Sequence, residues 1–276
     1  MPDVHTVNPH PDGPVMGHAE AFAKTGMLVL RGLASPDECA ALRNLAQEHI
    51  DPLLGPVEFE ADVRYPGAPI SREAAGGATP RRLLSALTRS PLVRSWATGA
   101  RLGNPIATLL GSDRVHVSQC HHNCIMTKHP GYSSATGWHQ DIRYWSFDRS
   151  DLVSAWLALG DENHANGGLR VIPGSHRLEV DRGRLDAELF LRDDLTENRA
   201  LIDQAVDVTL NAGDVLLFHS NVFHAAGINR TDAVKLSVVF TYHAGDNLPI
   251  PGTRSATHPS LPVATSRVGD TVPFPS

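Results

Sequence analysis

The chain has 276 residues, of which 41% are hydrophobic and 20% charged, and its formal net charge is −6. This composition is typical of a globular protein and excludes wholesale disorder. The acidic balance gives no general attraction to nucleic acid, so we expect no nucleic-acid partner. No apolar run approaches the roughly 18 residues of a membrane span. No signal peptide pattern is visible at the N-terminus, and we therefore expect a cytoplasmic protein.

The first half of the chain predicts a strand, two helices and a long loop. Residues 26–32 are apolar and bounded by glycines, as in a short strand. A capping box that begins at Ser35 predicts a helix to about His49. Residues 51–80 contain nine Gly or Pro and predict a loop, and long loops of this kind often act as lids. Residues 81–97 predict a helix that a proline interrupts.

The chain from residue 113 onward predicts a β-rich core. About eight short apolar segments there are bounded by Gly, Asn, Asp or Pro, which favours strands. We expect a mainly β fold with flanking helices (α+β), built as a double-stranded β-helix, or cupin-like jelly roll. The expected strands include 115–117, 123–128, 136–142, 152–159, 169–172, 205–210, 214–218 and 235–242.

We expect one domain over residues 1–276. Residues 1–18 are rich in Pro, Gly and His and predict a loose arm, and residues 247–276 predict a Pro-rich tail. The catalytic core then spans residues 20–246, and a polar, partly helical insert at 183–204 interrupts its strands.

The cysteines and histidines bound the metal chemistry. The three cysteines, Cys39, Cys120 and Cys124, are too few for a disulfide scaffold. The Cys-x3-Cys spacing has no second pair, so a thiolate zinc site is disfavoured. Fifteen histidines tilt any metal site toward nitrogen and oxygen ligands.

A histidine and a carboxylate stand two residues apart in GWHQDIRYW, at His139 and Asp141. In an extended segment alternate side chains point to one face, so the two would converge. A third ligand is available at His219 or His224, after the expected strand 214–218. Two histidines and one carboxylate on one face suit non-haem Fe(II) and oxygen chemistry.

Four segments in order carry a resemblance to a known family. They are FAKTGMLVLRGL (22–33), WHQD (138–141), NGGLRVIPGSH (166–176) and GDVLLFHSNVFH (213–224). Together they resemble the phytanoyl-CoA dioxygenase (PhyH) family, whose members are Fe(II)- and 2-oxoglutarate-dependent oxygenases with a double-stranded β-helix core. The resemblance spans about residues 20–245.

The resemblance implies the metal ligands His139, Asp141 and His224, which we also take as the catalytic residues. It favours His224 over His219, because the earlier histidine of this pair is usually structural in the family. His176, in Pro-Gly-Ser-His, matches a structural turn.

The expected anchor for the far carboxylate of 2-oxoglutarate departs from the family pattern. The family usually has an arginine about eleven residues after the last ligand, and this chain has Lys235 there. Strand alternation places Ser237 on the same side. Lysine offers a point charge instead of the two-pronged fork of arginine. We favour Lys235 with Ser237 over the alternative Arg230. The resemblance also places Lys128 and Trp156 at the cosubstrate, although Trp156 also suits plain core packing.

Three further residues are expected near the substrate. Arg143 would share the face of His139 and Asp141 if the strand continued, and it suits either an anionic substrate or a surface salt bridge. Tyr144 follows it directly, and His122 lies on a neighbouring segment. A basic helix face is also expected, and it comprises Arg81, Arg82, Arg89 and Arg94.

The resemblance implies a hydroxylase with Fe(II), 2-oxoglutarate and O2 as cofactor and cosubstrates. Asp141 argues against a halogenating relative, which lacks the carboxylate ligand. We expect a small acidic or lipid-linked substrate, with peripheral contact to a lipid surface. The segments YPGAP and GGATPRRLL resemble a bacterial branch that hydroxylates the Kdo sugar of lipopolysaccharide. The alternatives are an acyl-CoA or natural-product hydroxylase of this family, a non-redox cupin-like metal-binding protein or isomerase, and a partner-binding domain.

Overall fold

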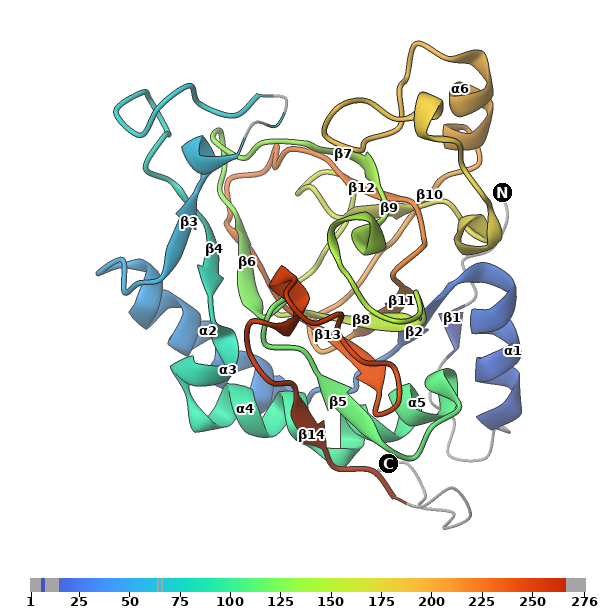
Figure 1. Cartoon of the computed structure of the whole chain (residues 1–276). Coiled ribbons are helices and arrows are strands. Elements are labelled where there is room, and N and C mark those ends of the chain that lie inside the picture. The colour runs from blue at the N-terminus through green and yellow to red at the C-terminus, as the bar shows by residue number, and fades with distance from the viewer. Residues whose placement is uncertain (1–5, 8–14, 64, 66, 267–276) are drawn as a thin grey trace.

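Two β-sheets face each other in the computed structural model, which describes residues 6–7, 15–63, 65 and 67–266 (Figure 1). The small sheet has the strand order β10-β9-β12-β7. It contains β7 (Thr136–His139), β9 (Leu169–Val171), β10 (Val206–Asp207) and β12 (His224–Ala226).

The large sheet has the order β1-β2-β11-β8-β13-β6-β4-β3, and β5 and β14 extend it beside β13. Its pairings are antiparallel except that of β1 with β2. It contains β1 (Thr6–Val7), β2 (Met27–Leu30), β3 (Val57–Phe59), β4 (Pro80–Leu84), β5 (Val115–Val117), β6 (Cys124–Lys128), β8 (Leu152–Ala158), β11 (Val215–His219), β13 (Lys235–Ala244) and β14 (Leu261–Val263).

Helices cover the outer face of the large sheet (Figure 1). Helix α2 begins as expected, because the Ser35 hydroxyl accepts from the Glu38 amide and the Glu38 carboxylate accepts from the Ser35 amide. None of the helices within the described residues is long and apolar enough to cross a membrane. The helices are α1 (Val15–Thr25), α2 (Pro36–Ile50), α3 (Ala86–Arg89), α4 (Pro91–Thr98), α5 (Ala100–Leu110) and α6 (Thr196–Ile202).

The central strands of the large sheet are buried on both faces, so alternate side chains enter two different cores. On β13, Val238 and Phe240 belong to the core under the helices, whereas Val239 belongs to the core between the sheets. By the same alternation Lys235 and Ser237 lie on the side of Val239. The polar pair at the start of β13 is therefore directed between the sheets.

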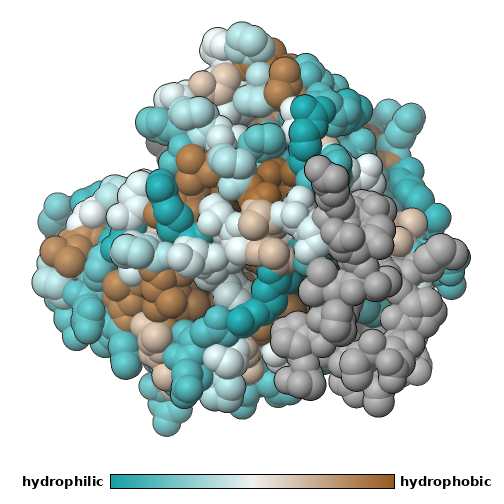
Figure 2. Space-filling model, turned by 90° about the horizontal axis from the view of Figure 1, so that it is seen from below, coloured by the Kyte–Doolittle hydropathy of each residue, from teal (hydrophilic) through white to brown (hydrophobic). Residues whose placement is uncertain are grey.

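The exposed underside of the molecule is mainly hydrophilic, with separate hydrophobic patches (Figure 2).

The expected helix over residues 81–97 is wrong in its first part. Residues 80–84 form β4, which pairs with β6 and places Arg82 opposite Met126. A run of two arginines and two leucines fits a helix or a strand, and the unpaired edge of β6 decides for the strand. The expected basic helix face consequently does not exist, because Arg81 is buried and Arg89 donates to main-chain carbonyls of the preceding loop.

Three other boundaries differ from expectation. The strand expected over 136–142 ends at His139, and a 3-10 turn, Asp141–Tyr144, follows. The expected loose arm includes the first turn of α1 from Val15, and its remaining residues lie largely outside the described part of the chain. The expected tail contributes β14, which pairs with β5.

The loop over 51–80 contains β3 and a short 3-10 turn, and its role as a lid stays a prediction.

A buried leucine of β11 is expected to contribute strongly to stability. Leu217 is fully buried in the core under the helices. Replacing it by alanine leaves a cavity, so Leu217→Ala should lower the free energy of unfolding by about 2–5 kcal/mol. Urea denaturation followed by circular dichroism measures this change. Leu248 is 55% exposed, and Leu248→Ala should stay within about 0.5 kcal/mol of the parent. Equal effects of the two changes would contradict this packing.

Candidate metal centre and cosubstrate pocket

The pairing of β7 with β12 brings two histidines together. His139 and His224 are direct partners across this antiparallel pair, and their ring centroids lie 4.2 Å apart. Residues directly opposite on one face of a sheet are near neighbours. Strand β12 also pairs with β9 on its other edge, so the position of His224 is fixed from both sides.

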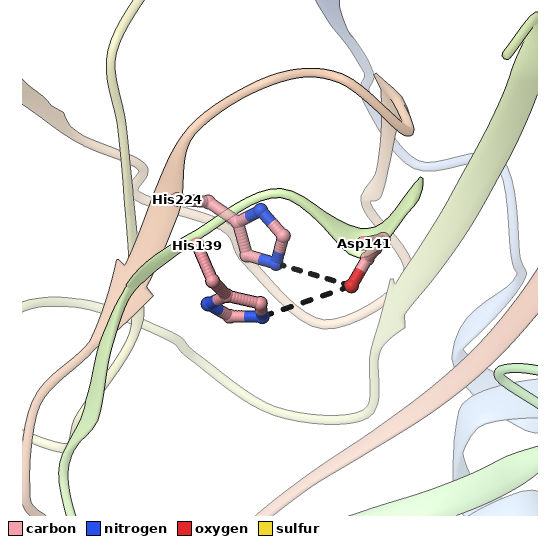
Figure 3. A group of neighbouring side chains, drawn as sticks. All are labelled: His139, Asp141 and His224. Carbon is pink, nitrogen blue, oxygen red and sulfur yellow. Dashed lines mark ion pairs between the residues drawn. The ribbon is translucent and has the colours of Figure 1, made fainter. Parts of the chain in front are cut away.

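Asp141 completes the cluster from the turn that follows β7 (Figure 3). Both imidazoles point their Nε2 atoms toward its carboxylate, and each Nε2 lies 3.7 Å from Oδ1. One ligand atom from each of the three residues lies within 4.8 Å of the others. This spacing leaves room for one cation between them.

Main-chain carbonyls orient both imidazoles. Nδ1 of His139 lies 2.9 Å from the Gly137 carbonyl, and Nδ1 of His224 lies 3.1 Å from the Val222 carbonyl. A carbonyl only accepts, so the proton is assigned to Nδ1 and the lone pair of Nε2 faces the cluster. Metal-bound histidines are usually oriented in this way.

The protonation states suit a divalent metal. Burial lowers the pKa of His139 to about 3, so this imidazole is neutral. Burial alone would raise the pKa of Asp141, but the neighbouring His122 and the two cluster histidines bring it below its usual value. Neutral imidazoles and an ionised carboxylate are the forms that bind metal. The donor set of two nitrogens and one carboxylate fits Fe(II) with open positions for other ligands.

The other histidines of the motifs lie outside this cluster. Nε2 of His219 lies 3.6 Å from Oδ1 of Asp151, and its ring packs against that of His176. Nε2 of His176 in turn lies 3.2 Å from the Ala23 carbonyl. The structure therefore brings His224, and not His219, beside His139.

A cavity opens beside the two histidines. Four basic side chains line it, namely those of Arg81, Arg82, Lys128 and Lys235. The indole of Trp156 lines it as well. A cavity with basic side chains next to the cluster is a candidate site for a small anionic cosubstrate such as 2-oxoglutarate.

Lys235 and Ser237 meet inside this region as expected, but a third residue joins them. Nζ of Lys235 donates to Oγ of Ser237 at 3.1 Å and to Oε2 of Glu162 at 2.9 Å. Oγ of Ser237 donates to Oε1 of Glu162 at 2.6 Å, and Nε1 of Trp156 donates to both oxygens at 3.1 Å. Glu162 was not anticipated from the sequence, because no local pattern links it to Lys235.

Lys128 stands opposite Lys235 across the pair β6–β13. Its Nζ donates to the carbonyls of Ser134 and Gly227, at 2.9 and 2.6 Å. Burial, with a contribution from Lys235, lowers the pKa of Lys128 to about 7. Arg230, the alternative anchor, is exposed and does not line the cavity.

Two of the three expected substrate residues lie at the cluster. His122 lines the cavity with Nδ1 3.5 Å from Oδ2 of Asp141, and burial lowers its pKa to about 4. The ring of Tyr144 lies 6.3 Å from that of His139. Arg143 instead donates to the side chain of Gln140 and does not line the cavity. Its expected place on the face of the ligands is wrong, because the chain turns at Asp141.

Several cavity residues were not anticipated at the site. Arg81 and Arg82 both pair with Glu58, at 3.0 and 3.2 Å. Phe190, from the insert, packs edge-on against His139 and Tyr65, with centroids 5.7 and 5.5 Å away. The adjacent arginines were visible in the sequence, but their place depends on recognising β4 as a strand.

Comparison with known proteins agrees with this geometry. Ectoine dioxygenase of Sphingopyxis alaskensis is 28% identical over 254 residues, which cover 86% of this chain and 78% of that protein. Human peroxisomal phytanoyl-CoA dioxygenase is 28% identical over 136 residues, or 45% of this chain and 39% of that protein. The solved structure of EctD from S. alaskensis with bound Fe has a TM-score of 0.72 and 24% identity, covering 96% of this chain and 92% of that one.

The fold is thus that of the cupin-like jelly-roll oxygenases, as expected. The sequence pattern of the phytanoyl-CoA dioxygenase (PhyH) family matches residues 22–237, and the chain belongs to this family. The expected enzyme class, a non-haem dioxygenase that uses Fe(II), 2-oxoglutarate and O2, is confirmed. This membership sets aside the non-redox cupin-like protein and the partner-binding domain.

The two histidines of the last motif provide a matched pair of variants. His224→Ala removes a cluster imidazole and should weaken Fe(II) binding at least about tenfold, a typical effect of losing a metal contact. His219→Ala removes an imidazole outside the cluster and should leave Fe(II) binding unchanged. Anaerobic equilibrium dialysis measures both affinities. A loss of iron in His219→Ala alone would contradict the assignment.

Proposed function

We propose that this protein hydroxylates a small polar molecule, with iron held by His139, Asp141 and His224. The observation that carries the proposal is the convergence of these three donors beside a cavity lined by basic side chains. Iron and 2-oxoglutarate, when bound, supply the activation of O2, with 2-oxoglutarate leaving as succinate and CO2 and a substrate C–H becoming C–OH.

The proposed anchor for the far carboxylate of 2-oxoglutarate is Lys235 with Ser237. Three observations support it: both residues face the space between the sheets, Lys235 lines the cavity, and their side chains touch. The exposed position of Arg230 disfavours the alternative. Trp156 and Lys128 line the same cavity and are proposed as its side walls.

His122 and Tyr144 are proposed to bound the substrate. Each lies beside a proposed metal ligand, His122 beside Asp141 and Tyr144 beside His139. The hydroxyl of Tyr144 donates to the Glu188 carbonyl of the insert. Aromatic walls of this kind exclude water and hold a small substrate in position.

The substrate class follows from two findings. Proteins similar over most of their length include ectoine dioxygenases, named for a small solute. The basic helix face, which would have suited contact with a lipid surface, is absent, since Arg81 and Arg82 line the cavity. A small soluble molecule is therefore favoured over the Kdo sugar, an acyl-CoA or a lipid surface. Three unpaired cysteines suit the reducing cytoplasm as the proposed location.

A lysine variant tests the cosubstrate anchor. Lys235→Met removes the cation and leaves the Glu162 carboxylate to repel a dianion, so the affinity for 2-oxoglutarate should fall at least about tenfold. Titration of the anaerobic Fe(II) protein with 2-oxoglutarate, followed by the visible band of the chelate, measures this affinity. Arg230→Ala is the matched control and should bind like the parent. The proposed anchor would be refuted if Arg230→Ala lost binding and Lys235→Met kept it.

A further inference from the structure

Glu162 is a buried carboxylate that contacts Lys235 and Trp156, two residues that line the cavity. It is 1% exposed and follows β8, where its main chain pairs with Leu210. Its two oxygens receive the lysine ammonium, the serine hydroxyl and the indole N–H described above. These are the donors that the far carboxylate of 2-oxoglutarate would need. The protein thus places its own carboxylate against the expected anchor.

We propose that Glu162 cancels the charge of Lys235, so that the pocket discriminates little between 2-oxoglutarate and a 2-oxo acid with an uncharged tail. The inference rests on the proposed function, because it concerns the cosubstrate of the same site. Glu162 is accordingly a specificity-determining residue, and the accepted cosubstrates form a class of short 2-oxo acids.

The ammonium group of Lys235 has few N–H bonds left for a ligand. An ammonium group has three N–H bonds, and Lys235 gives one to Glu162 and one to Ser237. One N–H bond is therefore left. Because Lys235 also lines the cavity, a ligand bound there can accept it. The far carboxylate of 2-oxoglutarate, placed there, would accept one hydrogen bond from Lys235. It would also be repelled by the like charge of Glu162 on the other side of the ammonium. Like charges sharing a buried site are costly. A tail without charge avoids that repulsion.

The neighbouring cations compensate only in part. Lys128 is held by two main-chain carbonyls, and its pKa of about 7 leaves it largely neutral at pH 8. Arg81 and Arg82 share the carboxylate of Glu58 instead. Glu60 adds a further carboxylate to the cavity wall. The far end of the pocket therefore has little net positive charge for a dianion to meet.

The test compares two five-carbon acids, 2-oxoglutarate and 2-oxopentanoate, which lacks the second carboxylate. Their affinities for the anaerobic Fe(II) protein are measured at pH 8 by isothermal calorimetry and by the chelate band. In the parent the two dissociation constants should agree within about tenfold. Glu162→Gln keeps the shape and the acceptor for Lys235 but removes the charge. It should bind 2-oxoglutarate at least about tenfold more tightly and 2-oxopentanoate as before.

The melting temperature of each apo-protein supplies a second readout. Glu162→Gln leaves a buried ammonium without its counter-charge, so it should melt lower than the parent and regain more stability on adding 2-oxoglutarate alone. Lys235→Met should show no such recovery. The parent comparison needs no variant, so it decides even if Glu162→Gln fails to fold.

Different outcomes separate this inference from the proposed function. A parent that prefers 2-oxoglutarate by about a hundredfold or more would overturn the role of Glu162 and leave the oxygenase standing. Weaker 2-oxoglutarate binding by Glu162→Gln would also overturn it, because Glu162 would then merely position Lys235. Binding of neither acid to the iron-loaded parent would refute both the inference and the proposed cosubstrate site.

Discussion

The register between β7 and β12 is the constraint on which the candidate site depends. It sets His139 opposite His224, and a slip of one residue would turn one imidazole to the other face of the small sheet. The same register fixes the turn after β7, which returns Asp141 to the two Nε2 atoms. Main-chain carbonyls then hold both rings, so the ligands are positioned by backbone rather than by long flexible side chains.

Most of the basic side chains in the space between the two sheets are paired with carboxylates of the protein itself. Arg81 and Arg82 share one carboxylate, and Lys235 is matched by Glu162. The Lys235–Glu162 pair is deeply buried, and an ion pair of this kind costs much desolvation and is weak grounds for stability, which favours a functional reason for it. An enzyme that binds a dianion beside a divalent metal must place each charge with care. We infer that the pairs set which anions can enter and where each end of them lies.

Sequence reasoning succeeded where one local pattern fixed a geometry. The histidine–carboxylate spacing led to His139 and Asp141, the family resemblance led to His224 and Lys235, and strand alternation placed Ser237 beside Lys235. The capping box at Ser35 predicted the start of α2.

It failed where the outcome depended on distant partners. Residues 80–84 are a strand because the edge of β6 is there to pair with them, and two arginines thereby moved from an expected surface to the cavity. Arg143 left the site because the chain turns at Asp141. Glu162 meets Lys235 across 73 positions, a contact that no local pattern contains.

The most direct test of the account is a crystal structure of the anaerobic protein grown with Fe(II) and 2-oxoglutarate, with anomalous diffraction measured at the iron edge. The account predicts one iron peak bonded to Nε2 of His139, Nε2 of His224 and the carboxylate of Asp141. It also predicts 2-oxoglutarate beside the iron, with its far end toward Lys235. Iron bound at His219 or His176, or a cluster without iron under saturating metal, would contradict it.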